Sequence, residues 1–232
     1  MNPPRVRATG AMTVTSVARA RVTRARSAKT TRVTVLFADL RGYTGLAERL
    51  APARIVPLLD EFFGVLAGAT VRHGGHVFHM AGDGMMAGFG LDDPAGSNGV
   101  GAGARGALAA GHEMLKNFAE VAERWRRELA IESGIGVGLH LGEVAMGLLG
   151  PPGRRRTTLV GDTVNVAARL CGRARAGELL MSSTVAAALD AGAAGGRNEK
   201  SIAVLQLPQF ELRGRSAPLD IWCIPASERL AF

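Results

Sequence analysis

Residues 33–44 have the sequence VTVLFADLRGYT, in which an apolar run followed by a glycine-containing segment predicts the first strand and the first turn. Residues 33–39 form a short apolar run rich in β-branched side chains, which is typical of a buried strand. The run ends on Asp39, and the following Arg41-Gly42-Tyr43-Thr44 turns the chain. Because glycine lets a backbone approach a ligand closely, this strand end is a candidate site.

Outward from this stretch, the sequence predicts strand hairpins mixed with crossing helices. Apolar residues at helical spacing predict a helix from Pro52 to Arg72 and a long amphipathic helix over residues 106–129. Strands at 76–81 and 85–89 flank Gly82-Asp83-Gly84 as a hairpin. Mixed hairpins and helices favour an α+β sandwich over an alternating βαβ protein. The pattern further predicts a helix over residues 162–175 and short strands at 131–141, 144–148, 157–160, 179–182, 202–205, 210–213 and 219–224.

The positive charge of the chain lies at its beginning. The 232 residues contain 28 Lys and Arg against 20 Asp and Glu, a net charge of +8. Residues 1–32 hold eight of the basic side chains and no acidic one, so residues 33–232 carry no net charge. We therefore expect a basic, disordered tail over 1–32, one domain over 33–232, and no nucleic-acid partner. A mitochondrial transit peptide has a similar composition and is the alternative for the tail.

The cysteine content and the apolar runs bear on the compartment. Cys171 and Cys223 are too few for a disulfide framework and fit a reducing environment. No stretch approaches 18 consecutive apolar residues, and residues 1–32 lack the apolar run of a secretory signal. We therefore expect a cytoplasmic protein with no transmembrane segment.

Two repetitive patterns argue only weakly for ligands. Residues 101–106 match G-x-G-x-x-G, but they follow a loop-like segment and not the strand that a dinucleotide fingerprint requires, so we expect a flexible lead-in to a helix. His73, His76 and His79 recur every three residues. Odd spacing on a strand sends His76 and His79 to opposite faces, so we expect no three-histidine metal site.

Two aspartates lie at the ends of apolar strands. Asp39 ends the first strand, Asp83 sits at a hairpin tip, and the two converge if their strands are neighbours. Paired carboxylates with open positions suit Mg²⁺, and two such ions can clamp the attacking and leaving oxygens of a phosphoryl transfer. The amides of Gly42, Tyr43 and Thr44 lead into a helix start and predict an anion site for a triphosphate.

The segment GDTVNVAARL, residues 161–170, predicts a helix with one polar face. Asp162 can cap it, and Asn165 and Arg169 are four residues apart and share a face. An amide and a guanidinium on one face can hydrogen-bond a ribose and neutralise a pentavalent phosphorus centre. Taken alone, the segment is explained as well by an ordinary solvent-facing helix.

Together these segments resemble the class III nucleotidyl cyclases. FADLRGYT at residues 37–44 resembles that family's F-x-D-[IL]-x-G-[FY]-T signature, and GDGMMAGFG at 82–90 resembles its second metal-aspartate hairpin. GVGLHLGEV at 136–144 looks like its next strand pair, and residues 161–170 match G-[DN]-x-V-N-x-A-x-R-L. Order and spacing agree from residue 33 to about residue 225. The resemblance implies a ferredoxin-like sandwich with a mainly antiparallel central sheet flanked by helices.

The resemblance also implies an activity and the residues that perform it. A nucleoside triphosphate would become its 3′,5′-cyclic monophosphate and pyrophosphate, with two Mg²⁺ or Mn²⁺ ions in each active site. Asp39 and Asp83 would bind the ions with help from the Leu40 carbonyl. Asn165 would orient the ribose and Arg169 would stabilise the transition state.

Further implied roles concern the phosphates, the dimer and the base. Arg213 matches the family's terminal-phosphate position, with Arg215 as a close competitor. Family members share each active site between two subunits, so the resemblance implies a homodimer. Base selection falls on His79 and Thr158, where the family's adenylyl enzymes usually have Lys and Asp or Thr. His79 is also not the Glu typical of guanylyl enzymes, so we expect ATP, with GTP as runner-up and a pyrimidine nucleotide still open.

Two other function classes are compatible with parts of the pattern. A non-catalytic nucleotide-binding regulator of this fold would have lost Asp39, Asp83, Asn165 or Arg169, and the sequence retains all four. A diguanylate cyclase on a related two-metal sheet would need a G-G-[DE]-E-F hairpin, which residues 82–86 do not supply. The four retained positions favour an active nucleotidyl cyclase.

Overall fold

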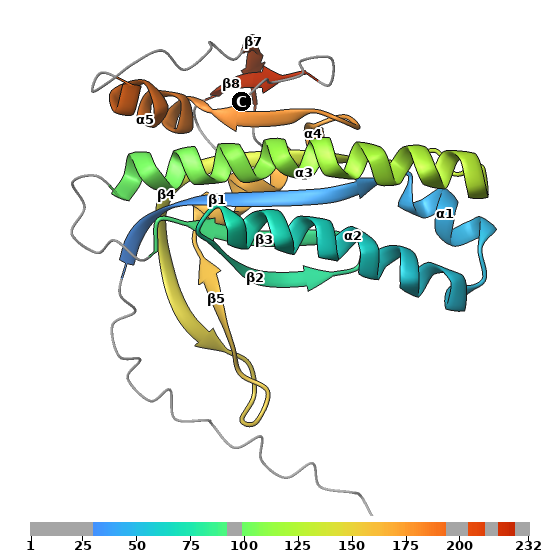
Figure 1. Cartoon of the computed structure of the whole chain (residues 1–232). Coiled ribbons are helices and arrows are strands. Elements are labelled where there is room, and N and C mark those ends of the chain that lie inside the picture. The colour runs from blue at the N-terminus through green and yellow to red at the C-terminus, as the bar shows by residue number, and fades with distance from the viewer. Residues whose placement is uncertain (1–29, 92–98, 194–203, 212–217, 226–232) are drawn as a thin grey trace, which may run out of the picture.

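The computed structural model describes residues 30–91, 99–193, 204–211 and 218–225. Within these residues, one sheet of eight strands carries five helices (Figure 1). Arg213 and Arg215 lie outside the described residues, as do parts of the strands expected at 202–205 and 210–213.

The strands form one mainly antiparallel sheet in the order β2-β3-β1-β4-β6-β8-β7, and β5 pairs with β4 away from this path. Only the pairing of β4 with β6 is parallel. The strand bounds are β1 Thr30–Arg41, β2 Gly75–Ala81, β3 Gly84–Phe89, β4 Gly134–Leu149, β5 Arg156–Val160, β6 Leu179–Ser182, β7 Leu205–Phe210 and β8 Leu219–Ile224.

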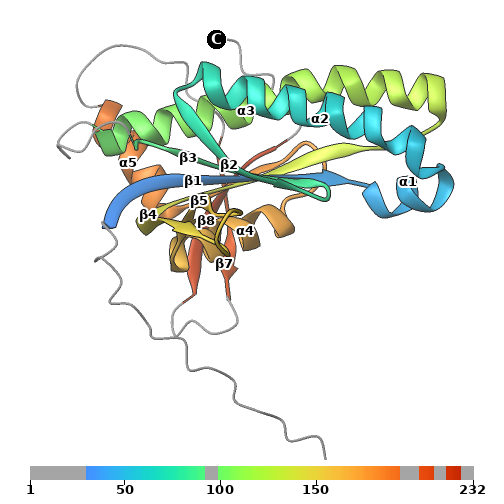
Figure 2. The same cartoon turned by 90° about the horizontal axis from the view of Figure 1, so that it is seen from below.

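The helices lie on both faces of the sheet. Helices α2, α3 and α5 cover one face, and α4 covers the other, which we call the α4 face (Figure 2). The first part of the chain, β1 to β4, has the βαββαβ order and the β4-β1-β3-β2 arrangement of a ferredoxin-like unit. The expected α+β sandwich is therefore confirmed. The helix bounds are α1 Tyr43–Arg49, α2 Pro52–Arg72, α3 Gly99–Leu129, α4 Asp162–Arg173 and α5 Ser183–Ala193.

Strand β1 lies between two apolar layers, which explains its continuous apolar sequence. Its alternate residues Leu36, Ala38 and Leu40 pack in the core under α2 and α3. Val33 and Val35 point the other way and pack with α4. A strand that is buried on both faces has no polar face, so the run reads as apolar throughout.

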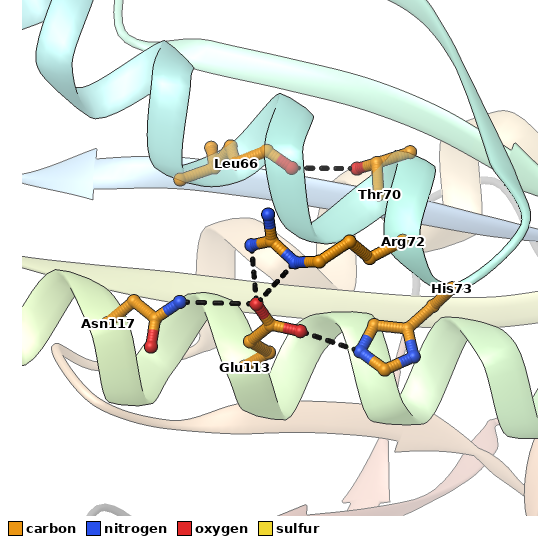
Figure 3. Close-up of polar contacts among 6 residues, drawn as sticks. All are labelled: Leu66, Thr70, Arg72, His73, Glu113 and Asn117. Atoms are coloured by element: carbon orange, nitrogen blue, oxygen red, sulfur yellow. Dashed lines mark hydrogen bonds and ion pairs between the residues drawn. The ribbon is translucent and has the colours of Figure 1, made fainter.

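Helices α2 and α3 are tied together by a polar cluster around Glu113 (Figure 3). Arg72 Nε and His73 Nε2, at the end of α2, lie 2.8 and 2.7 Å from the Glu113 carboxylate, and Asn117 Nδ2 donates to it over 3.2 Å. The hydrogen bond from Arg72 lowers the pKa of Glu113 below its ordinary value of 4.5, and the bond from His73 acts in the same direction. The cluster fixes the end of α2 against the middle of α3.

Strand β4 is one continuous strand where the sequence predicts two. Residues 142–143, expected as a connection, pair with Val33 and Arg32 of β1 inside the ladder. A Cβ on Gly142 would lie 2.5 Å from Thr163 Oγ1 at the start of α4. The glycine therefore serves close packing of α4 on the strand, and the prediction of a break was wrong.

Helix α3 begins at Gly99, so the G-x-G-x-x-G pattern lies inside a helix and not in a flexible lead-in. A Cβ on Gly103 would lie 3.0 Å from the Phe89 carbonyl, and one on Gly106 would lie 2.6 Å from the His73 carbonyl. These glycines let α3 approach the β3 end and the α2 end closely. They have a packing role that the loop interpretation missed.

Strand β2 contains a bulge that changes the expected directions of its histidines. His76 pairs with Gly88 and His79 pairs with Met86, with a register shift between Val77 and His79. Because positions 86 and 88 of β3 share one face, the bulge places both histidines on that face, contrary to the prediction. Both side chains are exposed, and the described residues contain no group of three or more His, Cys, Asp or Glu side chains that could hold a metal.

The outer half of β4 and β5 form a hairpin that projects from the body of the molecule (Figure 1). Several of its large apolar side chains are exposed: Met146 (44%), Leu148 (63%), Leu149 (56%) and Val160 (49%). Arg154, Arg155 and Arg156 at its tip are exposed as well. Among the helices that the structure describes, none is long and apolar enough to cross a membrane.

Candidate active site

The structure brings Asp39 and Asp83 together at one end of the sheet. Asp39 lies near the end of β1 and is paired with Gly84 of β3, while Asp83 sits in the turn between β2 and β3. The Leu40 amide donates to the Asp83 carbonyl over 2.9 Å, which holds the turn against the strand. A Cβ on Gly84 would lie 3.4 Å from Asp39 Oδ1, so a glycine there leaves the carboxylate room. We call Asp39, Leu40 and Asp83 the metal half-site.

The electrostatics of this half-site suit a cation. Partial burial raises the pKa of Asp39 above its ordinary value of 3.8; the Arg41 guanidinium opposes this rise and the Asp83 carboxylate adds to it. Two neighbouring carboxylates that are partly withdrawn from water repel each other, and a positive charge between them relieves the repulsion.

The donor set fits Mg²⁺ or Mn²⁺ better than a softer metal. The half-site offers two carboxylates and the backbone carbonyl of Leu40, all hard oxygen ligands. This is too few to enclose an ion in protein ligands, and Mg²⁺ typically takes one or two carboxylates and completes its shell with water and substrate phosphates. The residues therefore fit the metals that the sequence pattern implies.

The turn after β1 is built as the sequence predicts. Gly42 has a left-handed backbone (φ 86°), and its carbonyl accepts a hydrogen bond from the Leu46 amide over 3.1 Å, which begins α1. A Cβ on Gly42 would also lie 2.7 Å from the Glu132 carbonyl, so glycine is required on both counts. The residues that follow, Tyr43 and Thr44, enter the short helix α1 directly beside the metal half-site.

Helix α4 presents Asn165 and Arg169 on its exposed side. The helix packs on the sheet through Val166, Ala167 and Leu170, which are buried, whereas Asn165 and Arg169 are exposed. Thr163 Oγ1 donates to the Glu143 carbonyl over 2.6 Å and fixes the start of the helix. We call Asn165 and Arg169 the ribose half-site.

The two residues expected to read the base lie on neighbouring segments. His79 is exposed on β2, Thr158 is partly buried on β5, and these strands are in contact. Their neighbours Phe78 and Leu159 meet over Gly88, where an added Cβ would lie 3.1 Å from Phe78 and 3.0 Å from Leu159. The bulge in β2 turns His79 toward the α4 face, on which the ribose half-site also lies.

The structure does not bring the metal half-site and the ribose half-site of one chain together. Asp39 is paired with Gly136 of β4, whereas the start of α4 packs on Gly142, six residues along the strand. At about 3.3 Å per strand residue, and allowing for the helical rise to Asn165, the two half-sites are roughly 15–20 Å apart. Asn165 and Arg169 also face outward from the sheet on which Asp39 lies.

One residue of this region, Arg41, has a role that the sequence interpretation missed. The sequence pattern assigns Arg41 to a turn, but it is the last residue of β1 and forms an ion pair with Asp39. The same guanidinium donates to carbonyl groups at the end of α4. A signal existed in the sequence, because residues two apart on a strand share a face and Arg41 follows Asp39 by two.

The comparisons with known proteins agree with this fold. Residues 25–224 match the family model described as the adenylate and guanylate cyclase catalytic domain. The chain therefore belongs to the adenylate and guanylate cyclase catalytic-domain family, as its motifs indicated.

Two of the individual relatives are adenylate cyclases. An adenylate cyclase of Anabaena cylindrica is 32% identical over 154 residues, which are 63% of this chain and 28% of the relative. Adenylate cyclase 1 of Rhizobium meliloti is 28% identical over 85% of this chain and 28% of its own length. The chain thus spans less than a third of these relatives.

Two solved structures resemble the chain over almost their whole length. The adenylyl cyclase CyaB from P. aeruginosa matches 88% of this chain and 100% of its own, with a TM-score of 0.75 and 26% identity. The guanylyl cyclase Cya2 matches 88% of this chain and 98% of its own, with a TM-score of 0.71 and 27% identity. Similarity of this kind covers adenylyl and guanylyl enzymes alike, so base preference depends on individual side chains.

Proposed function

We propose that this chain is a nucleotidyl cyclase that converts ATP to 3′,5′-cyclic AMP and pyrophosphate at sites shared between two copies of the chain. The observation that carries the proposal is the metal half-site: two adjacent carboxylates at the end of a buried strand, beside a glycine turn that leads into a helix. The retention of Asn165 and Arg169 on an exposed helix face supports it.

In the proposed reaction the 3′-hydroxyl releases its proton to solvent and its oxygen forms a bond to the α-phosphorus. The bond from that phosphorus to the bridging oxygen of pyrophosphate breaks, and pyrophosphate leaves. Asp39, the Leu40 carbonyl and Asp83 would hold divalent ions, which would supply charge stabilisation for the phosphoryl transfer. Asn165 hydrogen-bonds the ribose and so orients the 3′-hydroxyl. Arg169 stabilises the negative charge that develops around the phosphorus.

Two groups of residues bind the triphosphate in this proposal, one beside the metal half-site and one at the terminal phosphate. The turn at Gly42, Tyr43 and Thr44 offers backbone amides beside the metal half-site, where an anion is favoured. Arg213, with Arg215 as the competing candidate, binds the terminal phosphate in this proposal. Both arginines lie outside the described residues, so their assignment rests on the sequence alone.

A homodimer follows from the separation of the half-sites. A substrate held by Asp39 cannot reach Asn165 of the same chain, because Asn165 lies roughly 15–20 Å away on an outward-facing surface. A two-fold axis places each metal half-site opposite the partner's ribose half-site and generates two equivalent active sites. The projecting β4–β5 hairpin, with its exposed apolar side chains, supports such an assembly.

The preference for ATP rests on His79 and Thr158. Imidazole can donate to adenine N1 or accept from another base, depending on its tautomer, and the Thr158 hydroxyl can do either. His79 lies on the face of the sheet that carries the ribose half-site, and strand β5, which holds Thr158, is in contact with β2. We place the protein in the cytoplasm, since its two cysteines are buried, unpaired thiols compatible with a reducing compartment.

The decisive experiment is incubation of the purified protein with Mn²⁺ and, separately, with ATP, GTP, CTP or UTP. Chromatography should show cyclic AMP and an equal amount of pyrophosphate from ATP, and less product from the other three. A better yield from GTP or a pyrimidine nucleotide would overturn the choice of base. The absence of a cyclic product from all four would overturn the enzyme itself.

The shared site has a separate test in mixed variants. Asp39→Ala and Asn165→Ala should each be inactive alone, whereas a mixture should regain up to one working site per heterodimer. If the mixture stays inactive while native mass spectrometry shows heterodimers, the shared-site arrangement is wrong.

A further inference from the structure

Arg41 joins the metal half-site to the end of α4. Its Nη1 donates to the Asp39 carboxylate, its Nη2 donates to the Cys171 carbonyl, and its Nε donates to the Ala174 carbonyl over 3.0 Å. Only 23% of the side chain is exposed. One planar guanidinium therefore holds acceptors from β1 and from the last turn of α4 at the same time, which a lysine cannot do.

The surroundings of Arg41 are shaped to admit it. On the neighbouring strand β4, a Cβ at Gly136 would lie 2.5 Å from Arg41 Nη2 and 2.9 Å from the Ala174 carbonyl. A side chain at position 136 would therefore displace the guanidinium from α4. A cation at the carboxyl end of a helix is also favoured by the helix dipole.

A divalent ion at Asp39 would weaken the ion pair between Arg41 and Asp39 relative to the hydrogen bonds from Arg41 to α4. The ion and the guanidinium are both positive and draw on the same carboxylate, so each weakens the hold of the other. The remaining bonds of Arg41 all go to α4, the helix that carries Asn165 and Arg169. If Arg41 moves, it therefore pulls on the carboxyl end of α4. Because α4 is a rigid element, the movement also reaches its exposed face, which forms the ribose half-site.

We propose that Arg41 is a positioning residue that transmits occupancy of the metal half-site to α4 of the same chain. The inference rests on the proposed function, in which α4 of one chain serves the active site whose metals are held by the partner. Arg41 then couples the two active sites of the homodimer: metal binding in one adjusts the ribose half-site of the other.

The first test follows α4 with no substrate present. Hydrogen exchange of the peptide over residues 165–178 is measured on the full chain with and without Mn²⁺ alone, and Mn²⁺ binding is followed by electron paramagnetic resonance. In the wild type, Mn²⁺ should change the exchange rate by at least about threefold. In Arg41→Lys and Arg41→Gln the ion should still bind, but the exchange rate should no longer respond.

Arg49→Gln is the matched control, because Arg49 is an exposed arginine of α1 that donates to the Ala130 carbonyl over 3.2 Å. It should respond to Mn²⁺ like the wild type. An unchanged response in Arg41→Gln, or no response in a wild type that binds Mn²⁺, overturns the inference. If Asp39→Ala binds Mn²⁺ as tightly as the wild type, the metal half-site itself is misassigned and the proposed function fails with it.

The second test places Arg41→Gln on one chosen chain of the mixed dimer. The Asn165→Ala chain supplies Asp39 to the one working site, so Arg41→Gln on that chain alters the metal side of the site. The Asp39→Ala chain supplies α4 with Asn165, so Arg41→Gln on that chain alters the helix side of the site. Both placements should lower kcat by about tenfold, because small misplacements of reacting groups are costly. Only the first should lower the Mn²⁺ concentration needed for half-maximal activity, because the guanidinium no longer competes with the ion for the Asp39 carboxylate.

If either placement behaves like Arg49→Gln on the same chain, Arg41 does not serve both elements and the inference is wrong. Inactivity of the parent mixture, which carries no Arg41 substitution, counts instead against the shared site. The two failures are therefore separable.

Discussion

Asp39 and Arg41 reach the same side of the sheet because they are two residues apart on β1. Their neighbours Ala38 and Leu40 alternate with them and are buried under α2 and α3. A strand that is apolar almost to its end thus delivers one carboxylate and one guanidinium to the α4 face. The same alternation fails for His76 and His79, because the bulge in β2 inserts one residue and restores a common face.

At the residue scale, His79 offers a test of base selection. His79→Lys should raise the ratio of kcat/KM for ATP over that for GTP by about tenfold, since one polar contact to a base edge accounts for discrimination of that order. The matched control is His76→Lys, three residues earlier on the same strand and face, which should leave the ratio unchanged. An equal effect of both variants, measured by product chromatography, would remove His79 from base recognition.

A second residue-scale prediction concerns the cluster at Glu113. Its pKa is lowered in the folded protein, so its stabilising contribution is present above the ordinary value of 4.5 and is lost as pH falls through the lower folded value. Glu113→Gln should lower the free energy of unfolding by about 1 kcal/mol at pH 7, a modest figure because the ion pair with Arg72 is partly solvated.

The measurement for this cluster is urea unfolding at pH 7 and again near pH 3.5. The difference between wild type and Glu113→Gln should shrink at the lower pH. Glu120→Gln, an exposed glutamate on the same helix, should differ little from wild type at either pH. A difference that is as large at pH 3.5 as at pH 7 would mean that the carboxylate charge is not what stabilises the contact.

At the scale of elements, α4 is positioned by the glycines of β4. A Cβ on Gly138 would lie 2.2 Å from the Cys171 amide nitrogen and 2.5 Å from the Ala167 carbonyl oxygen, so the helix backbone rests directly on the strand. This contact sets the height and direction of α4 and therefore the position of Asn165. Both atoms belong to backbone, which cannot move aside as a side chain can.

Gly138→Ala should accordingly lower the free energy of unfolding by about 3 kcal/mol, because overpacking against backbone forces the helix to shift. Gly147→Ala lies on the same strand with nothing within 4 Å of the added Cβ, and it should change stability by less than about 0.5 kcal/mol. Urea unfolding of both variants checks the pair. Equal stabilities would show that α4 does not rest on Gly138.

The elements themselves were predictable to different degrees. Helix α2 and strands β6 and β8 begin and end where the apolar periodicity places them. The sequence prediction made helix α3 too short and divided β4 in two, in both cases at segments that contain glycine. Those glycines make room for other elements, and a requirement of that kind depends on partners distant in the sequence.

At the scale of the whole molecule, the two half-sites lie on different elements. The β4–β5 hairpin projects from the body of the molecule (Figure 1), and several of its apolar side chains are exposed. A body without net charge can bind a polyanionic substrate only through local groups, and the proposed ones are carboxylates with metal, turn amides and arginines. In the proposed function, those groups complete an active site only when two copies of the chain assemble.

Leu148→Arg, on the projecting hairpin, should therefore weaken the dimer by at least about tenfold in Kd and reduce activity in parallel, because a buried charge replaces apolar contact. Val71→Arg on α2, at a similarly exposed position, should leave both unchanged. Sedimentation equilibrium together with the ATP assay checks this. A dimer of Leu148→Arg as tight as that of the wild type would move the interface elsewhere.

The sequence by itself determined the α+β class, the family and the four polar positions that define the proposed site. It could do so because local periodicity and short motifs are properties of neighbouring residues. Only the tertiary structure decided that β4 is continuous, that His79 faces the α4 side, and that Arg41 links Asp39 to Ala174. These facts depend on strand register, a bulge and the packing of α4, which bring together residues as far as 133 positions apart.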